Sequence, residues 1–220
     1  MDLQELGLQA LQEGNVEEAV KHFSEAIELN PDDAIGYINF ANLLASIGDD
    51  ARAIKFFEVA IEKDPNAASA YYGLGISYFS NTTWSKARAA FEKSIALGME
   101  EGDVYFMLGL TFIYEGENKL ALPYLKRAVE IDPEDVEAHF QLGLAFAQLE
   151  YLKEARTHLE ETIKLDEGHS DAYYNLGIIE TYEDNNEAAR DCFESAIFFQ
   201  EGHTLATNAL RLLDEMETEK

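Results

Sequence analysis

Hydrophobic and small positions recur along the 220-residue chain with a period of 34 residues. One series of small residues, spaced 34 apart, is Gly7, Ala41, Gly75, Gly109, Gly143 and Gly177. A second small series is Ala19, Ala53, Ala87, Ala121, Ala155 and Ala189, and a large apolar series is Phe23, Phe57, Phe91, Leu125, Leu159 and Phe193. Six copies follow one another without insertion or deletion, which predicts a repeat protein in which each unit packs on its neighbours.

The pattern within each copy predicts two helices. In the second copy, apolar residues at helical spacing predict one helix over about 34–47 and another over about 50–63. Gly48 and Asp49 form the turn between them, and Pro65 prevents the second helix from continuing. The small residues let the helix backbones approach closely, while the large residues fill the remaining space. We therefore expect an all-α protein.

The motifs of these copies resemble those of the tetratricopeptide repeat (TPR). YYGLGISY with ARAAFEKSI, and YFMLGLTF with LALPYLKRAVEIDP, show its pattern of an aromatic residue, Leu-Gly, a second aromatic, then Ala, Phe, Ala and Pro. Stretches such as YINFANLL, AASAYYG and LALPYLKRAVE are also similar to those of a small bacterial member of the family. The resemblance covers nearly the whole chain.

This resemblance implies a right-handed superhelical solenoid of six helix-turn-helix TPR units plus a C-terminal capping helix. The expected units are about 1–33, 34–67, 68–101, 102–135, 136–169 and 170–203, and the capping helix is 204–220. The family's terminal proline is replaced by Met99, Glu167 and Glu201, so Gly and Asp must form the turns in those copies.

Two pairs of adjacent tyrosines stand 102 residues apart, at Tyr71–Tyr72 and at Tyr173–Tyr174. The first member of each pair shares a helix face with the small residues, so we expect it in the core. The second member lies on another apolar stripe, and the resemblance implies that this stripe lines the concave, peptide-holding side. The alternative is that these rings only pack against adjacent first helices. The candidate partner-binding residues are Ile38, Asn39, Asn42, Tyr72, Ile76, Phe79, Asp103, Phe106, Leu110, Glu137, Phe140, Asp171, Tyr174 and Asn175.

The formal net charge of −27 limits the possible partners. Nucleic acid and anionic membranes would be repelled, whereas a basic protein would be attracted; RNA-handling proteins fit on charge alone. The copies carry −8, −2, 0, −4, −4 and −7, and the tail −2, which suits a partner with basic flanks and an apolar centre. The alternative is that the charge only maintains solubility.

The first helix of every copy lacks Lys and Arg. TPR domains that hold chaperone C-termini clamp the carboxylate with such residues, so we expect no chaperone-tail binding. Asp103, Glu137 and Asp171 stand three residues before Phe106, Phe140 and Tyr174, which places each acid on the same face as the ring. These acids either flank the groove or compensate the helix dipole, and the two roles are compatible.

No catalytic motif and no metal-ligand spacing stands out in the sequence. Cys192 is flanked by a helical pattern and reads as a packing residue. The N-terminal stretch lacks a secretory pattern and the apolar runs are short, so we expect a cytoplasmic protein. The prediction is a non-catalytic scaffold that binds a protein or peptide partner without cofactor or metal. The alternative is a self-assembling protein whose groove holds a neighbouring molecule's segment.

Overall fold

The computed structural model describes residues 2–218, and within this range all regular secondary structure is α-helical. The helices form six helix-turn-helix pairs followed by a capping helix, which confirms the predicted TPR arrangement. Residues 219–220 of the predicted cap lie outside the described range. The helices are α1 (Leu3–Gln12), α2 (Val16–Leu29), α3 (Ala34–Ser46), α4 (Asp50–Lys63), α5 (Ala68–Ser80), α6 (Trp84–Ala96), α7 (Gly102–Tyr114), α8 (Asn118–Ile131), α9 (Val136–Gln148), α10 (Leu152–Leu165), α11 (Ser170–Tyr182), α12 (Asn186–Phe199) and α13 (Thr204–Thr218).

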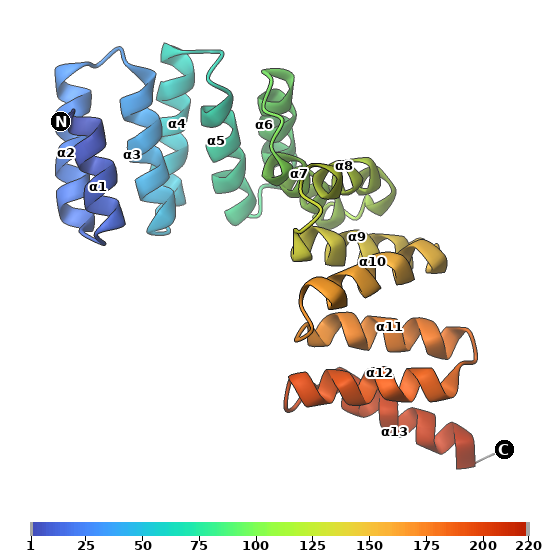
Figure 1. Cartoon of the computed structure of the whole chain (residues 1–220). Helices are drawn as coiled ribbons and strands as arrows, with labels where there is room; N and C mark the ends of the chain where they lie inside the picture. The colour runs from blue at the N-terminus through green and yellow to red at the C-terminus, as the bar shows by residue number, and fades with distance from the viewer. Residues whose placement is uncertain (1, 219–220) are drawn as a thin grey trace. The chain divides into compact units, whose positions relative to one another are not determined.

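The chain divides into two compact units, residues 1–116 and 117–220. The boundary falls between α7 and α8, inside the fourth copy. In unit 1, α1 to α6 lie one beside the next, and in unit 2, α9 to α12 are stacked in the same way (Figure 1). None of the helices described between residues 2 and 218 has the length and apolar composition needed to cross a bilayer.

The turn inside each copy contains one residue in the left-handed region, always at the same register position. Gly14, Gly48 and Gly116 have φ values of 75°, 80° and 82°. In the other three copies the position is occupied by Thr82, Glu150 and Asp184, with φ values of 54°, 62° and 60°. An L-residue with a side chain adopts this conformation at a cost, so these three turns carry local backbone strain.

The turns that lack the family proline use Gly and Asp, as predicted. Asp166 Oδ1 accepts a hydrogen bond of 2.9 Å from the Gly168 amide, which tightens the turn after α10. Gly98 and Gly202 have φ values of 96° and 83° in the turns after α6 and α12. The turns that contain Pro65 and Pro133 have the same Asp contact, which Asp64 accepts from the Asn66 amide and Asp132 from the Glu134 amide, so the contact does not depend on the proline.

The core consists of the predicted small and large series. The Ala series on the second helices is fully buried, and the large residues packed beside it are buried to the same degree. Glycines on the first helices receive the large rings: a Cβ at Gly75 would lie 2.5 Å from Phe91 Cε1. In the second copy Ala41 has a real Cβ, and the Phe57 ring lies against Gly73 of the next copy instead.

Arginines on three second helices pair with acids on the helix that follows or directly after its end. Arg88 Nη1 lies 3.0 Å from Glu115 Oε2, just after α7. The Arg156 guanidinium of α10 contacts Glu180 of α11 and lies 2.7 Å from Glu183. At the end of unit 2, Arg190 Nη2 of α12 lies 2.6 Å from an Asp214 oxygen of α13. These ion pairs link three of the helix pairs to the helix that follows.

Candidate functional site

A hollow of about 380 Å³ opens in unit 1 among α3, α4 and α5; we call it the first hollow. Three predicted groove residues line it, and polar side chains and a carboxylate surround its apolar floor. Its lining residues are Asn42, Ala45, Ser46, Asp50, Phe57, Tyr72, Gly73, Ile76 and Ser80. A side chain from a partner could enter this space with apolar contact below and polar contact at the rim.

Tyr72 is the aromatic wall of the first hollow. Its ring centroid lies 6.0 Å from that of Phe91, a fully buried residue of α6. Burial, and then the negative charges of Asp103 and Glu101, raise the pKa of the Tyr72 hydroxyl to about 12. The hydroxyl therefore stays protonated at neutral pH and can donate a hydrogen bond. The same charges make this wall electrically negative.

A second hollow, of about 290 Å³, occupies the equivalent place in unit 2. Six of its lining positions stand 102 residues after those of the first hollow, so the same register position opens in both units. It is lined by Ala147, Gln148, Glu150, Leu152, Asn175, Ile178, Ile179 and Tyr182. Leu152 replaces Asp50 and Tyr182 replaces Ser80, which makes this hollow more apolar, while Glu150 supplies its carboxylate.

The register position one copy after the first hollow is occupied by aromatic rings. Phe79, a predicted groove residue, lies 5.0 Å from the Trp84 ring and 5.4 Å from the Tyr114 ring. Trp84 and Tyr114 stack with centroids 4.9 Å apart. These three residues stand where the first hollow has Ala45, Asp50 and Ser80, so large rings occupy the equivalent space. Phe79 is therefore half-buried in an aromatic cluster rather than on an open groove wall.

Two predicted groove residues are core residues. Ile38 is 8% exposed and belongs to a cluster with Ala41 and Leu74. Phe140 is 9% exposed, and its ring lies 4.4 Å from that of His169. We predicted that both side chains are accessible to a partner, and this prediction is wrong because neighbouring side chains cover them.

The remaining apolar candidates are half-buried. Phe106 and Leu110 lie on α7 of unit 1, and Tyr174 lies on α11 of unit 2. The Tyr174 ring centroid is 6.0 Å from that of Phe193 and 5.4 Å from that of His203. Tyr174 thus repeats the Tyr72–Phe91 contact of unit 1.

The predicted polar residues already take part in local contacts. Asn39 Nδ2 of α3 donates to Gln4 Oε1 of α1 at 2.8 Å. Asn175 Nδ2 donates to the Asp171 carbonyl at 2.7 Å. Such bonds fix the orientation of these side chains while leaving them at the surface of the first helices.

The three acids at the starts of first helices are exposed, but their contacts differ. The Glu137 carboxylate accepts from Gln141 Nε2 at 2.8 Å. Asp171 Oδ1 lies 3.1 Å from His203 Nε2, and His203 Nδ1 accepts from the Ala206 amide at 3.1 Å. His203 therefore caps α13, and Asp171 orients it. The negative charge of Asp103 helps to raise the pKa of the Tyr72 hydroxyl.

The first tyrosine of the 71–72 pair differs from its prediction. Tyr71 is half-buried and lines an open surface between α5 and α6, whereas Tyr105 and His139 of the same register series are buried. Tyr37 and Tyr173 of this series are half-buried as well, so the first tyrosine of each pair lies at the edge of the core rather than inside it.

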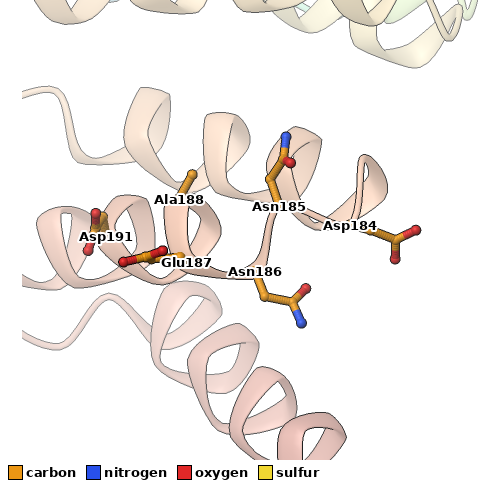
Figure 2. A pocket seen from close by; sticks show the side chains of 6 residues that line it. All are labelled: Asp184, Asn185, Asn186, Glu187, Ala188 and Asp191. Atoms are coloured by element: carbon orange, nitrogen blue, oxygen red, sulfur yellow. The ribbon is translucent and has the colours of Figure 1, made fainter.

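Sequence reasoning did not single out a wide, polar hollow of about 500 Å³ at the turn between α11 and α12. Figure 2 shows its side chains spread along the turn, with Asp184 and Asp191 at opposite ends of the group. Among the described residues no group of His, Cys, Asp or Glu could hold a metal ion. We therefore assign this hollow no function.

Basic residues are confined to one class of helix. Lys220 lies outside the described range, and every other Lys and Arg is on an even-numbered helix or on α13. The predicted absence of basic residues from the first helices is thus confirmed for the described structure. Neither hollow contains a cation that could clamp a peptide carboxylate.

Comparison with known proteins agrees with this architecture. The tetratricopeptide repeat family matches residues 10–75, 60–101, 136–169 and 170–197, and a family described as TPR repeat matches residues 109–150. The crystal structure of YrrB, described as a TPR protein with an unusual peptide-binding site, is 44% identical with a TM-score of 0.80, covering 86% of this chain and 97% of that one. A solved structure of PilF from Pseudomonas aeruginosa has a TM-score of 0.80 at 16% identity, over 99% of this chain and 96% of that one, and so shares the fold.

Two curated relatives align over short segments. The TPR repeat-containing protein YrrB of Bacillus subtilis (strain 168) is 56% identical over 39 residues, which are 18% of this chain and 19% of that protein. The Hsp70-Hsp90 organising protein of Plasmodium falciparum is 50% identical over 46 residues, which are 21% of this chain and 18% of that protein. The aligned segments thus span about a fifth of each curated relative. Taken with the YrrB structure, which aligns along most of both chains, these matches show that the chain belongs to the tetratricopeptide repeat family.

Proposed function

We propose that the protein is a non-catalytic scaffold in which the first hollow and the second hollow are separate sites, each of which binds a basic peptide segment of a partner protein. The observation that carries this proposal is the recurrence of one hollow, at the same register position, in both units. Packing needs of a single repeat do not explain the recurrence, because the equivalent position between α5 and α7 is filled by rings.

The chemistry of both hollows suits an apolar side chain with a cationic neighbour. Asp50 and Glu150 bring a carboxylate to the first and second hollows respectively. Asp103 lies near enough to Tyr72 for its negative charge to raise the pKa of the Tyr72 hydroxyl. No Lys or Arg is among the residues that line the two hollows, so no cation of the lining neutralises these carboxylates. A basic segment would be steered to them and held by short-range pairing.

The likeness to YrrB supports peptide binding, because that relative is described as having a peptide-binding site and is 44% identical. We place the protein in the cytoplasm, and on charge alone RNA-handling proteins are suitable partners. A C-terminal carboxylate of a chaperone does not fit, since no cation lines either hollow.

The test begins with crosslinking and mass spectrometry of the full chain in cell extract, which identifies the partner and the contacted residues. Calorimetry with that partner then compares Tyr72→Ala and Asp50→Asn with the wild type. Tyr72→Ala removes the aromatic wall and should weaken binding by about 1 kcal/mol or more. Asp50→Asn keeps the side-chain shape and should weaken binding mainly at low salt.

Phe198→Ala is the matched control, since Phe198 is an aromatic residue that is 80% exposed and lies outside both hollows. Circular dichroism checks that each variant folds. The proposal is wrong if the partner binds Tyr72→Ala and Asp50→Asn as tightly as the wild type. Light scattering over a dilution series tests the alternative, a self-assembling protein: concentration-dependent growth that Tyr72→Ala abolishes would favour it.

A further inference from the structure

A separate hollow of about 390 Å³ lies in unit 1 between α5 and α6; we call it the lysine hollow. Tyr71, Leu74 and Tyr78 of α5 form one wall, and Lys86, Ala90 and Lys93 of α6 form the other. Tyr71 and Tyr72 are neighbours on α5, yet Tyr72 faces the first hollow and Tyr71 faces this one. The lysine hollow is therefore independent of the proposed peptide site.

The lysine hollow exists because one ring is missing. In the second copy, the position equivalent to Ala90 is Phe56. The Phe56 ring packs edge-on against Phe40 at 4.7 Å and lies 6.4 Å from the Tyr37 ring. Every other copy also carries a larger side chain than Ala90 at this position: His22, Phe56, Tyr124, His158 and Cys192. The third copy thus retains the surrounding aromatic residues Tyr71 and Tyr78 but lacks the ring that Phe56 provides in the second copy.

Two ammonium groups border the space. Lys86 Nζ lies 5.2 Å from the centroid of the Tyr78 ring, and Lys93 Nζ lies 5.9 Å from that of Tyr71. Within the part of the chain that the structure describes, neither lysine forms a salt bridge. They stand seven residues apart, about two helical turns, so both face the same side of α6.

The charge around the lysine hollow differs from that of the chain as a whole. Helix α6 carries Lys86, Arg88 and Lys93 against the single acid Glu92. Arg88 is paired with Glu115, and at the edge of the hollow Glu58 accepts a hydrogen bond of 3.2 Å from the Tyr78 hydroxyl. The residues that line the hollow include Lys86 and Lys93 and no carboxylate, so the surface that a ligand would touch is positively charged.

We propose that the lysine hollow binds an acidic segment of a partner protein by seating one aromatic side chain of that segment beside Tyr71, over the buried Ala90. The ring takes the place that Phe56 fills in the second copy, and carboxylates on either side of it pair with Lys86 and Lys93. The protein then has two binding faces of opposite preference: basic segments in the first and second hollows, and an acidic aromatic segment here.

The test uses a random dodecapeptide library displayed on phage, selected on the full-length protein after depletion on Ala90→Phe. This substitution supplies the missing ring from within and should leave the melting temperature at or above that of the wild type. Enriched peptides should contain an aromatic residue flanked by Asp or Glu. A library that yields no peptide distinguishing the two proteins, or only basic ones, overturns the proposal.

Fluorescence anisotropy with one enriched, labelled peptide then gives the decisive comparison. Ala90→Phe, and the double variant Lys86→Gln with Lys93→Gln, should each weaken binding at least tenfold, whereas Tyr72→Ala should change it less than twofold. Both lysines are exposed, so the double variant tests the proposal even where Ala90→Phe fails to fold. Unchanged binding by the double variant overturns the proposal. Sedimentation of the wild type showing self-association that the double variant loses would make a second copy the occupant, and the assignment of a partner protein would be wrong.

Discussion

The close approach of Phe91 to Gly75 makes a quantitative prediction about Gly75→Ala. Alanine is the better helix former, and in the middle of α5 it should gain about 0.5–1 kcal/mol over glycine. Against this gain, its Cβ would lie 2.5 Å from Phe91 Cε1, closer than real Cβ contacts come, so the ring must move. Phe91 is fully buried, and overpacking of this kind costs about 1–3 kcal/mol.

The surroundings decide how far the Phe91 ring can move. In the second copy Ala41 is tolerated because the Phe57 ring lies against Gly73 of the next copy. The residue equivalent to Gly73 for Phe91 is Met107, which offers no such space. We therefore expect Gly75→Ala to lower the free energy of unfolding by about 1–2 kcal/mol, the overpacking cost less the helix gain.

Gly143→Ala is the matched control, because Leu159 replaces the phenylalanine there. The new Cβ would lie 3.0 Å from Leu159 Cγ, a contact that a small shift of the leucine relieves. We expect this variant to stay within about 0.5 kcal/mol of the wild type, the usual range for a change without strain. Adding Phe91→Leu to Gly75→Ala should recover part of the loss, since leucine needs less room above the new methyl group.

Urea denaturation followed by circular dichroism and by Trp84 fluorescence measures these changes. Trp84 belongs to unit 1, so its signal reports on the unit that contains Gly75. The steric reasoning is wrong if Gly75→Ala is as stable as Gly143→Ala. It is also wrong if Phe91→Leu lowers the free energy of unfolding as much in the Gly75→Ala variant as it does in the wild type.

Three further predictions concern the turns, the thiol and a half-buried histidine. Thr82→Gly, Glu150→Gly and Asp184→Gly should each stabilise the protein by up to about 1 kcal/mol, because each relieves a left-handed conformation; thermal melts that drop would contradict this. Burial, then the charges of nearby acids, raises the pKa of the Cys192 thiol to about 11, so a disulfide reagent at pH 8 should modify it far more slowly in the folded protein than in urea. Burial, then neighbouring positive charge, lowers the pKa of His158 to about 4. The stability that the neutral imidazole provides is therefore fully present above about pH 6.5 and is lost as the pH falls toward 4. Urea titrations should show that His158→Gln loses less free energy of unfolding between pH 7 and pH 5 than the wild type does.

The 34-residue register predicted the helices and the core because both depend on residues within one copy. The buried Ala and Phe series, and the Gly48 turn, follow directly from spacing. The non-glycine left-handed residues were not predicted, although the register held the signal: Thr82 stands midway between Gly48 and Gly116 in the series. The N-cap roles of His169 and His203 could have been found in the same way, since they stand in register with Asp135.

The candidate site was harder to predict because accessibility depends on several copies at once. Tyr71 and Tyr105 occupy the same register position, yet only Tyr105 is buried. The difference depends on the side chains that neighbouring helices contribute, which no pattern on the first helix reveals. Likewise, Phe79 lies on the stripe that predicts a groove, but the rings of Trp84 and Tyr114, from two other helices of unit 1, pack against it.

The ion pairs between successive helices have a consequence for fragments of the chain. Within unit 1, α7 packs on α6 and Arg88 pairs with Glu115, just as within unit 2 α13 packs on α12 and Arg190 pairs with Asp214. Each unit thus ends in a helix that covers the apolar side of its last second helix, as a terminal cap must. A fragment that ends before α13 should therefore expose the apolar side of α12, and urea denaturation should show it to be less stable than the full chain.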